Sequence, residues 1–125
     1  MGFEFHRAFI ERAGRASFHI HGDGWHLMDD VGRLPGLNCV SIEDDAQGRK
    51  PRVFDRRADW RDRCGDLPIA MTCTVAELAE GLDTSSLPGG VHYMTWSASV
   101  AEANALMERV WSYRAPRDLW AVRRS

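Results

Sequence analysis

The sequence has few of the features that mark secreted, membrane-spanning or disordered proteins. It contains three cysteines, Cys39, Cys64 and Cys73, and no Cys-x-x-Cys pair, which argues against a disulfide framework and against a cysteine-rich zinc site. No apolar run approaches the roughly eighteen residues that a membrane helix needs. The first residues also lack the apolar stretch of a secretory signal. We therefore expect a cytoplasmic protein without membrane association.

The chain also lacks a large excess of positive or negative charge. The formal net charge is −2, and Lys50 is the only lysine beside fifteen arginines. A nearly neutral chain creates no broad positive field for phosphates, so nucleic acid is not the partner we expect. Hydrophobic residues make up 44% of the chain, which is too much for intrinsic disorder. Length and composition predict one globular domain over residues 1–125.

The common catalytic motifs are absent as well. The chain has no Gly-x-Ser-x-Gly elbow, no Walker loop and no Gly-x-Gly-x-x-Gly after a strand, and each of these would indicate a nucleophile or a nucleotide site. Cys73 stands just before a predicted helix, whose N-terminus would lower the pKa of its thiol. A buried strand position is the favoured interpretation of Cys73. We accordingly expect no cofactor.

Apolar spacing and turn residues predict the elements in the first half of the chain. Residues 3–13 have the period of an amphipathic helix. Alternating residues on both sides of Gly22-Asp23-Gly24 predict a tight hairpin over 18–27. Strands over 37–43 and 52–54 would form a second hairpin. The charge-rich segment 55–66 is predicted to be a short exposed helix or a loop.

Two strand-to-helix transitions are predicted in the second half. The run 68–73 leads into a capping box formed by Thr74 and Glu77, and a strand over 91–96 leads into another formed by Ser99 and Glu102. The second box opens the strongest predicted helix, and a last strand follows at 119–122. We expect that helix, over 100–113, to pack on the sheet through the apolar residues Val100, Met107, Val110 and Trp111.

Together these elements predict an α+β fold. It would be a single domain with a mixed, mainly antiparallel sheet and two to three helices packed on one face. The two C-terminal crossovers would be right-handed if their strands pair in parallel.

A group of histidines is the best candidate for chemistry. Residues i and i+2 of a strand point to the same face, so His19 and His21 could supply two imidazole ligands, and Asp23 or His26 across the predicted turn could supply a third ligand. The favoured interpretation is that these histidines are simply polar residues on the solvent-exposed face of a hairpin, as the alternation requires. The alternative is a small histidine-dependent or metal-dependent enzyme centred on His19, His21 and His26.

The leading hypothesis is a small binding protein of the inhibitor, immunity-type or regulatory class, with another protein as its partner. Aromatic and arginine side chains together are typical of binding hot spots. The candidate contact surface centres on Trp60, with Arg56, Arg57, Arg61 and Arg63 around it. In the competing interpretation, Trp60 pins its segment onto the core. A third possibility is a ligand-binding fold with an apolar pocket lined by Met94 and Trp96.

Overall fold

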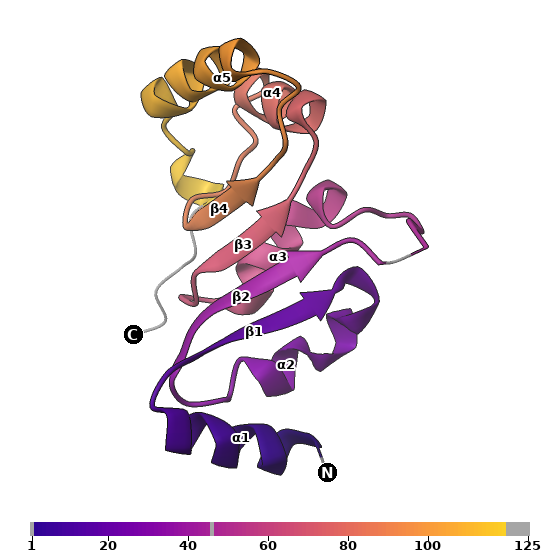
Figure 1. Cartoon of the computed structure of the whole chain (residues 1–125), viewed down its shortest axis with the longest axis vertical. Helices are drawn as coiled ribbons and strands as arrows, with labels where there is room; N and C mark the ends of the chain where they lie inside the picture. The colour runs from indigo at the N-terminus through magenta and orange to yellow at the C-terminus, as the bar shows by residue number, and fades with distance from the viewer. Residues whose placement is uncertain (1, 46, 120–125) are drawn as a thin grey trace.

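The computed structural model describes residues 2–45 and 47–119 (Figure 1). Its strands are β1 (Ala16–His21), β2 (Leu37–Glu43), β3 (Ile69–Thr72) and β4 (Val91–Met94). Its α-helices are α1 (Gly2–Ala13), α2 (Met28–Val31), α3 (Arg57–Cys64), α4 (Val75–Asp83) and α5 (Val100–Ser112). Three short 3-10 helices are η1 (Gly22–Leu27), η2 (Phe54–Arg56) and η3 (Arg117–Leu119).

The four strands form one sheet in the order β1-β2-β3-β4, and all three neighbouring pairs are parallel. The chain is therefore an α/β protein with strands and helices in alternation. The predicted α+β fold with a mainly antiparallel sheet is wrong. Figure 1 shows the sheet running from α1 and α2 beside β1 to α4 and α5 beside β4, with α3 behind its middle strands.

The two predicted hairpins do not form. Consecutive parallel strands need a crossover that returns the chain to the same end of the sheet, and here η1 and α2 make the first crossover while η2 and α3 make the second. Gly24 allows η1 to pack closely, because a Cβ atom at this position would lie 2.5 Å from Cγ1 of Ile20. Gly24, which suggested a tight turn, thus serves a close contact between η1 and β1.

The core lies on one face of the sheet. Strand residues at alternate positions join a single hydrophobic cluster with side chains from α2, α3, α4 and α5. These strand residues are Ile20, Val40, Ile42, Ile69 and Met71. Burying these side chains against the helices stabilises the fold through the hydrophobic effect.

The opposite face, here called the open face, is outside this core. Its residues include Ser17, His19, His21, Cys39, Ser41, Glu43, Ala70, Thr72 and His92, and each is at least partly exposed. Parallel sheets are usually covered on both faces and then have continuous hydrophobic strands. This sheet keeps the alternation of apolar and polar residues that is typical of antiparallel sheets, and that alternation explains the wrong prediction.

Several helix predictions are confirmed. The predicted helix over 3–13 corresponds to α1. The segment 55–66, predicted to be an exposed helix or a loop, contains the helix α3, in which Trp60, Arg61 and Cys64 are buried. The Thr74 hydroxyl accepts from the backbone N–H of Glu77, whose carboxylate accepts from the backbone N–H of Thr74 in return. Such a reciprocal pair satisfies two of the free N–H groups at the start of a helix.

The predicted long helix is also confirmed, but its packing face is different. In α5, Leu106 is buried, Val110 is half-buried, and Val100, Met107 and Trp111 are exposed. At the end of the described chain, Leu119 belongs to η3, and the remainder of the predicted strand 119–122 lies outside the described residues. Within the described ranges, no helix combines the length and the hydrophobicity needed to cross a membrane.

Candidate metal site on the open face

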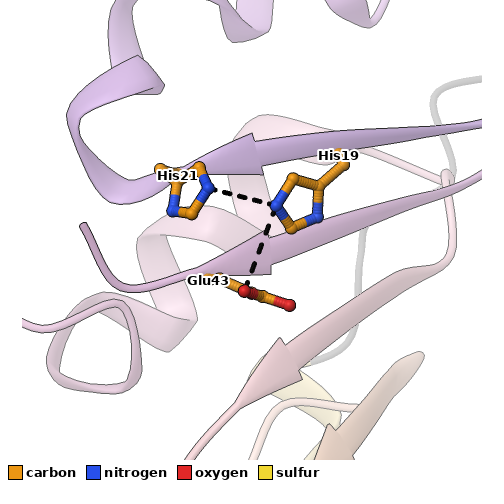
Figure 2. A group of neighbouring side chains, drawn as sticks. All are labelled: His19, His21 and Glu43. Atoms are coloured by element: carbon orange, nitrogen blue, oxygen red, sulfur yellow. Dashed lines mark hydrogen bonds and ion pairs between the residues drawn. The ribbon is translucent and has the colours of Figure 1, made fainter. Parts of the chain in front are cut away.

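Two histidines and a glutamate meet on the open face at the carboxyl ends of β1 and β2 (Figure 2). His21 and Glu43 are the last residues of their strands and are direct register partners. His19 lies two residues before His21, so all three side chains leave the sheet on the same side. In α/β sheets, ligands bind at the carboxyl ends of the strands.

The ligand atoms of the three side chains are close together. Nε2 of His19 lies 3.2 Å from Nε2 of His21 and 4.0 Å from Oε2 of Glu43, and all three ligand atoms fall within 4.8 Å of one another. Two imidazole nitrogens on a tetrahedral zinc lie about 3.4 Å apart, given Zn–N bonds of about 2.0–2.1 Å. The two histidines therefore already have nearly the spacing that a shared metal ion requires.

A backbone carbonyl orients one of the two histidines. Nδ1 of His21 lies 2.8 Å from the carbonyl oxygen of Asp44, an acceptor, so in the neutral ring Nδ1 carries the proton and Nε2 carries a lone pair. His19 then donates its Nε2 proton to that lone pair. Carbonyl contacts of this kind orient metal-binding histidines in many proteins. A metal ion would replace the proton between the rings.

Solvent reaches this group of side chains. The side chains of His19 and Glu43 are 50% and 43% exposed, so an ion enters without any movement of the fold. Two imidazoles and one carboxylate form the donor set of catalytic zinc sites, which keep a fourth position for water or substrate. The same set on one face also binds Fe²⁺ in oxygenases.

The structure confirms that His19 and His21 lie together, but it does not bring His26 to them. His26 lies in η1 and is exposed, because the chain turns into a helix after Gly22 and does not return as a second strand. Glu43 takes its place beside the two histidines. The predicted strand 37–43 ends at Glu43, but its pairing with β1 could not be read from local sequence.

The predicted contact surface around Trp60 is rearranged in the structure. Trp60 is 1% exposed, as in the competing interpretation that it pins its segment onto the core. It packs edge-on against Trp25, with ring centroids 4.5 Å apart. The guanidinium groups of Arg56 and Arg63 lie 4.0 Å and 4.6 Å from the centre of the Trp25 ring. The structure thus groups these two arginines around Trp25.

The other two predicted contact residues bind the protein's own main chain. Arg61 is 3% exposed and donates to the carbonyl oxygens of Gly65, Leu67 and Gly90. Burial lowers the pKa of the Arg61 guanidinium from its ordinary value. Arg57 donates to Ser86. A partner role for Arg56, Arg57 and Arg63 stays a prediction, while Trp60 and Arg61 are inaccessible in this structure.

The N-termini of α4 and α5 also lie at the carboxyl ends of the strands. Glutamate side chains of the two helices already accept hydrogen bonds from backbone N–H groups there. Glu77 accepts from the N–H of Thr74 at 2.8 Å, and Glu102 accepts from the N–H of Ala98 at 2.6 Å. A phosphate would have to displace a carboxylate at either end. Burial raises the pKa of the nearby Cys73 thiol to about 11, so the helix does not activate it as a nucleophile.

Comparison of the chain with protein-family models, with curated proteins and with solved structures gives no match. The functional interpretation therefore depends on the geometry of the site.

Proposed function

We propose that the protein binds a divalent transition metal of the zinc class through His19, His21 and Glu43, with at least one coordination position open to solvent. The observation that carries this proposal is the 3.2 Å separation of the two Nε2 atoms at the carboxyl end of a parallel sheet. It supports the alternative that the sequence left open, a metal-dependent protein, with Glu43 in the role first given to His26.

Such a site would fit hydrolytic chemistry. A zinc ion with three protein ligands lowers the pKa of its bound water to about 7, which supplies hydroxide at neutral pH. The open face leaves room for a substrate above the site. The three ligands are two imidazoles and one carboxylate, without a sulfur donor from cysteine or methionine. This combination favours Zn²⁺ or Fe²⁺ over Cu⁺.

The test is a Zn²⁺ titration of the metal-free protein. Binding is measured by calorimetry or by competition with a chromophoric chelator. We expect one ion per chain. His19→Ala and His21→Ala should each weaken binding by more than the roughly 10–100-fold that loss of an outer-shell partner costs. Co²⁺ in place of Zn²⁺ should give the intense visible bands of a four-coordinate centre.

The matched controls are His26→Ala and His92→Ala. Both residues are exposed histidines, and His92 lies on the same open face, so they test for unspecific imidazole binding. They should leave Zn²⁺ affinity within about twofold of the unaltered protein. Equal losses in all four variants, each with an unchanged circular dichroism spectrum, would contradict the proposal.

Binding another protein remains the second candidate, and the sequence favours it. The observation in its favour is exposed aromatic surface, since Trp96 and Trp111 are each 78% exposed and such residues are frequent in interfaces. Trp60 gives it no support, because it is buried. Failure to bind Zn²⁺ at micromolar concentration would leave this role as the stronger of the two.

A further inference from the structure

A second site lies at the opposite edge of the sheet, where β4, α4 and α5 line an open-sided cavity of about 740 Å³. Its walls are mainly apolar side chains from the three elements and from the loop before β4. They include Leu78, Leu82, Met94, Leu106, Met107 and Val110. Cavities of about 300–1,000 Å³ with mostly apolar walls and few polar groups are typical of sites for small molecules.

The cavity exists because α5 is held at a distance from the sheet. Arg109 binds the carboxylate of Asp83 and the carbonyl oxygen of Ala79, which ties the outer side of α5 to α4. Tyr113 binds both backbone groups of Leu87 at the end of α5. Leu106, about one turn before Arg109, is the one fully buried residue of α5, so the space beneath the helix remains open.

One polar atom in the wall lacks a partner. Thr95 Oγ1 is buried and makes no hydrogen bond to any residue that the structure describes. The wall's two tyrosine hydroxyls are already bound, that of Tyr93 to the carbonyl oxygen of Pro88 and that of Tyr113 to Leu87. A buried hydroxyl without a partner is unfavourable, and a ligand that forms a hydrogen bond with it would remove part of that cost.

We infer that this cavity binds a small aromatic molecule that carries one hydrogen-bonding group directed at Thr95. The walls favour aromatic rings over alkyl chains, because Trp96, Tyr93 and Tyr113 offer ring contacts and Met94 and Met107 offer sulfur–ring contacts. Trp96 lies at the mouth and is largely exposed. This site is independent of the proposed metal site at β1 and β2.

The probe for the test is 2-naphthol, which has two fused rings and one hydroxyl, and naphthalene is its matched partner without the hydroxyl. We expect saturable one-to-one binding of 2-naphthol by calorimetry, with naphthalene about 3–10-fold weaker, the ratio that one hydrogen bond produces. In ¹³C-methyl spectra the Met94 and Met107 signals should shift. The signal of Met28, a fully buried residue of α2, should not.

Three variants locate the ligand. Ala103→Phe fills the cavity from α5 and should weaken 2-naphthol at least about tenfold. Thr95→Val should remove the preference for 2-naphthol over naphthalene. Trp111→Ala, the control on the exposed side of α5, should bind both probes as before. Unaltered spectra for Met94 and Met107, or unchanged affinity in Ala103→Phe, would overturn the inference.

Two further results would also overturn it. If Thr95→Val keeps the preference for 2-naphthol, the hydroxyl of Thr95 is not the anchor. If 1-dodecanol binds more tightly than 2-naphthol, the site takes alkyl chains. Because Ala103→Phe could disturb folding, Met107→Trp serves as a second filling variant at a position that is already 47% exposed.

Discussion

His21 and Glu43 are paired residue to residue across the parallel strands β1 and β2, and each is the last residue of its strand. The spacing of their Cα atoms is therefore fixed by backbone hydrogen bonds of the sheet and not by a loop. His19 joins them from the same strand as His21. Sites built on strands hold their geometry better than sites built on loops, so a metal ion would meet ligands that are already in position.

Metal binding should weaken on acidification. An imidazole must be neutral to bind a metal ion, so protons compete with Zn²⁺ for His19 and His21. We expect the affinity for Zn²⁺ to fall as the pH is lowered, because metal binding must release the protons of its imidazole ligands. Chelator competition at several pH values measures this change. An affinity that does not depend on pH would show that the imidazoles do not hold the ion.

Trp60→Ala should destabilise the fold. Trp60 is nearly inaccessible and packs against Trp25, and truncation of a buried tryptophan costs about 3–5 kcal/mol of unfolding free energy. Urea denaturation measures the loss. The control is Trp96→Ala, whose side chain is largely exposed and whose removal should change the unfolding free energy by less than about 0.5 kcal/mol. Equal effects would show that Trp60 is not a core residue.

Leu106 should be the residue through which α5 stabilises the protein. It is the buried side chain of this helix, so Leu106→Ala should cost about 2–5 kcal/mol. Trp111→Ala removes a larger side chain from the same helix but should cost little, because Trp111 is 78% exposed. Thermal unfolding of the two variants compares them directly. The reverse order would mean that α5 packs through the face predicted from its apolar spacing.

Alkaline pH should reduce stability through two cysteines. Burial raises the pKa of Cys64 and of Cys73 from 9.0 to about 11. Between pH 9 and 11 the unfolded chain therefore binds fewer protons at these thiols than the folded chain. Their contribution to stability is fully present below pH 9 and is lost as the pH rises through that window.

Two measurements check the effect of these thiols. The unfolding free energy of the unaltered protein should fall more steeply from pH 9 to pH 11 than that of Cys64→Ala/Cys73→Ala. In native buffer at pH 8, iodoacetamide should modify the half-buried Cys39 at least about tenfold faster than Cys64 or Cys73. Equal labelling of all three cysteines would contradict the burial of the two.

Local features of the sequence predicted local structure well. The capping residue Thr74 with Glu77, and Ser99 before α5, define helix starts because each cap bonds backbone groups within four residues of itself. The alternation in β1 likewise placed His19 and His21 on one face, since this depends only on strand geometry. These results need no knowledge of distant residues.

Strand direction, by contrast, was decided by tertiary structure. Alternating apolar and polar residues show that a strand has one buried face. Parallel and antiparallel strands with one buried face have the same pattern. The crossover from β1 to β2 determines direction, and it depends on η1 and α2 packing against Ile20 and the core. A pattern restricted to residues 18–27 contains no information on that packing.

The candidate site illustrates the same division. The sequence by itself determined that two imidazoles share a face of β1, because this follows from the two-residue repeat of a strand. Only the tertiary structure decided that Glu43 is their neighbour and His26 is not, and that Trp60 is buried. Contacts between residues distant in the chain form when the strands pair and the helices cover one face of the sheet. The free energy that stabilises these contacts comes from packing of the whole core, so no short segment of sequence reveals it.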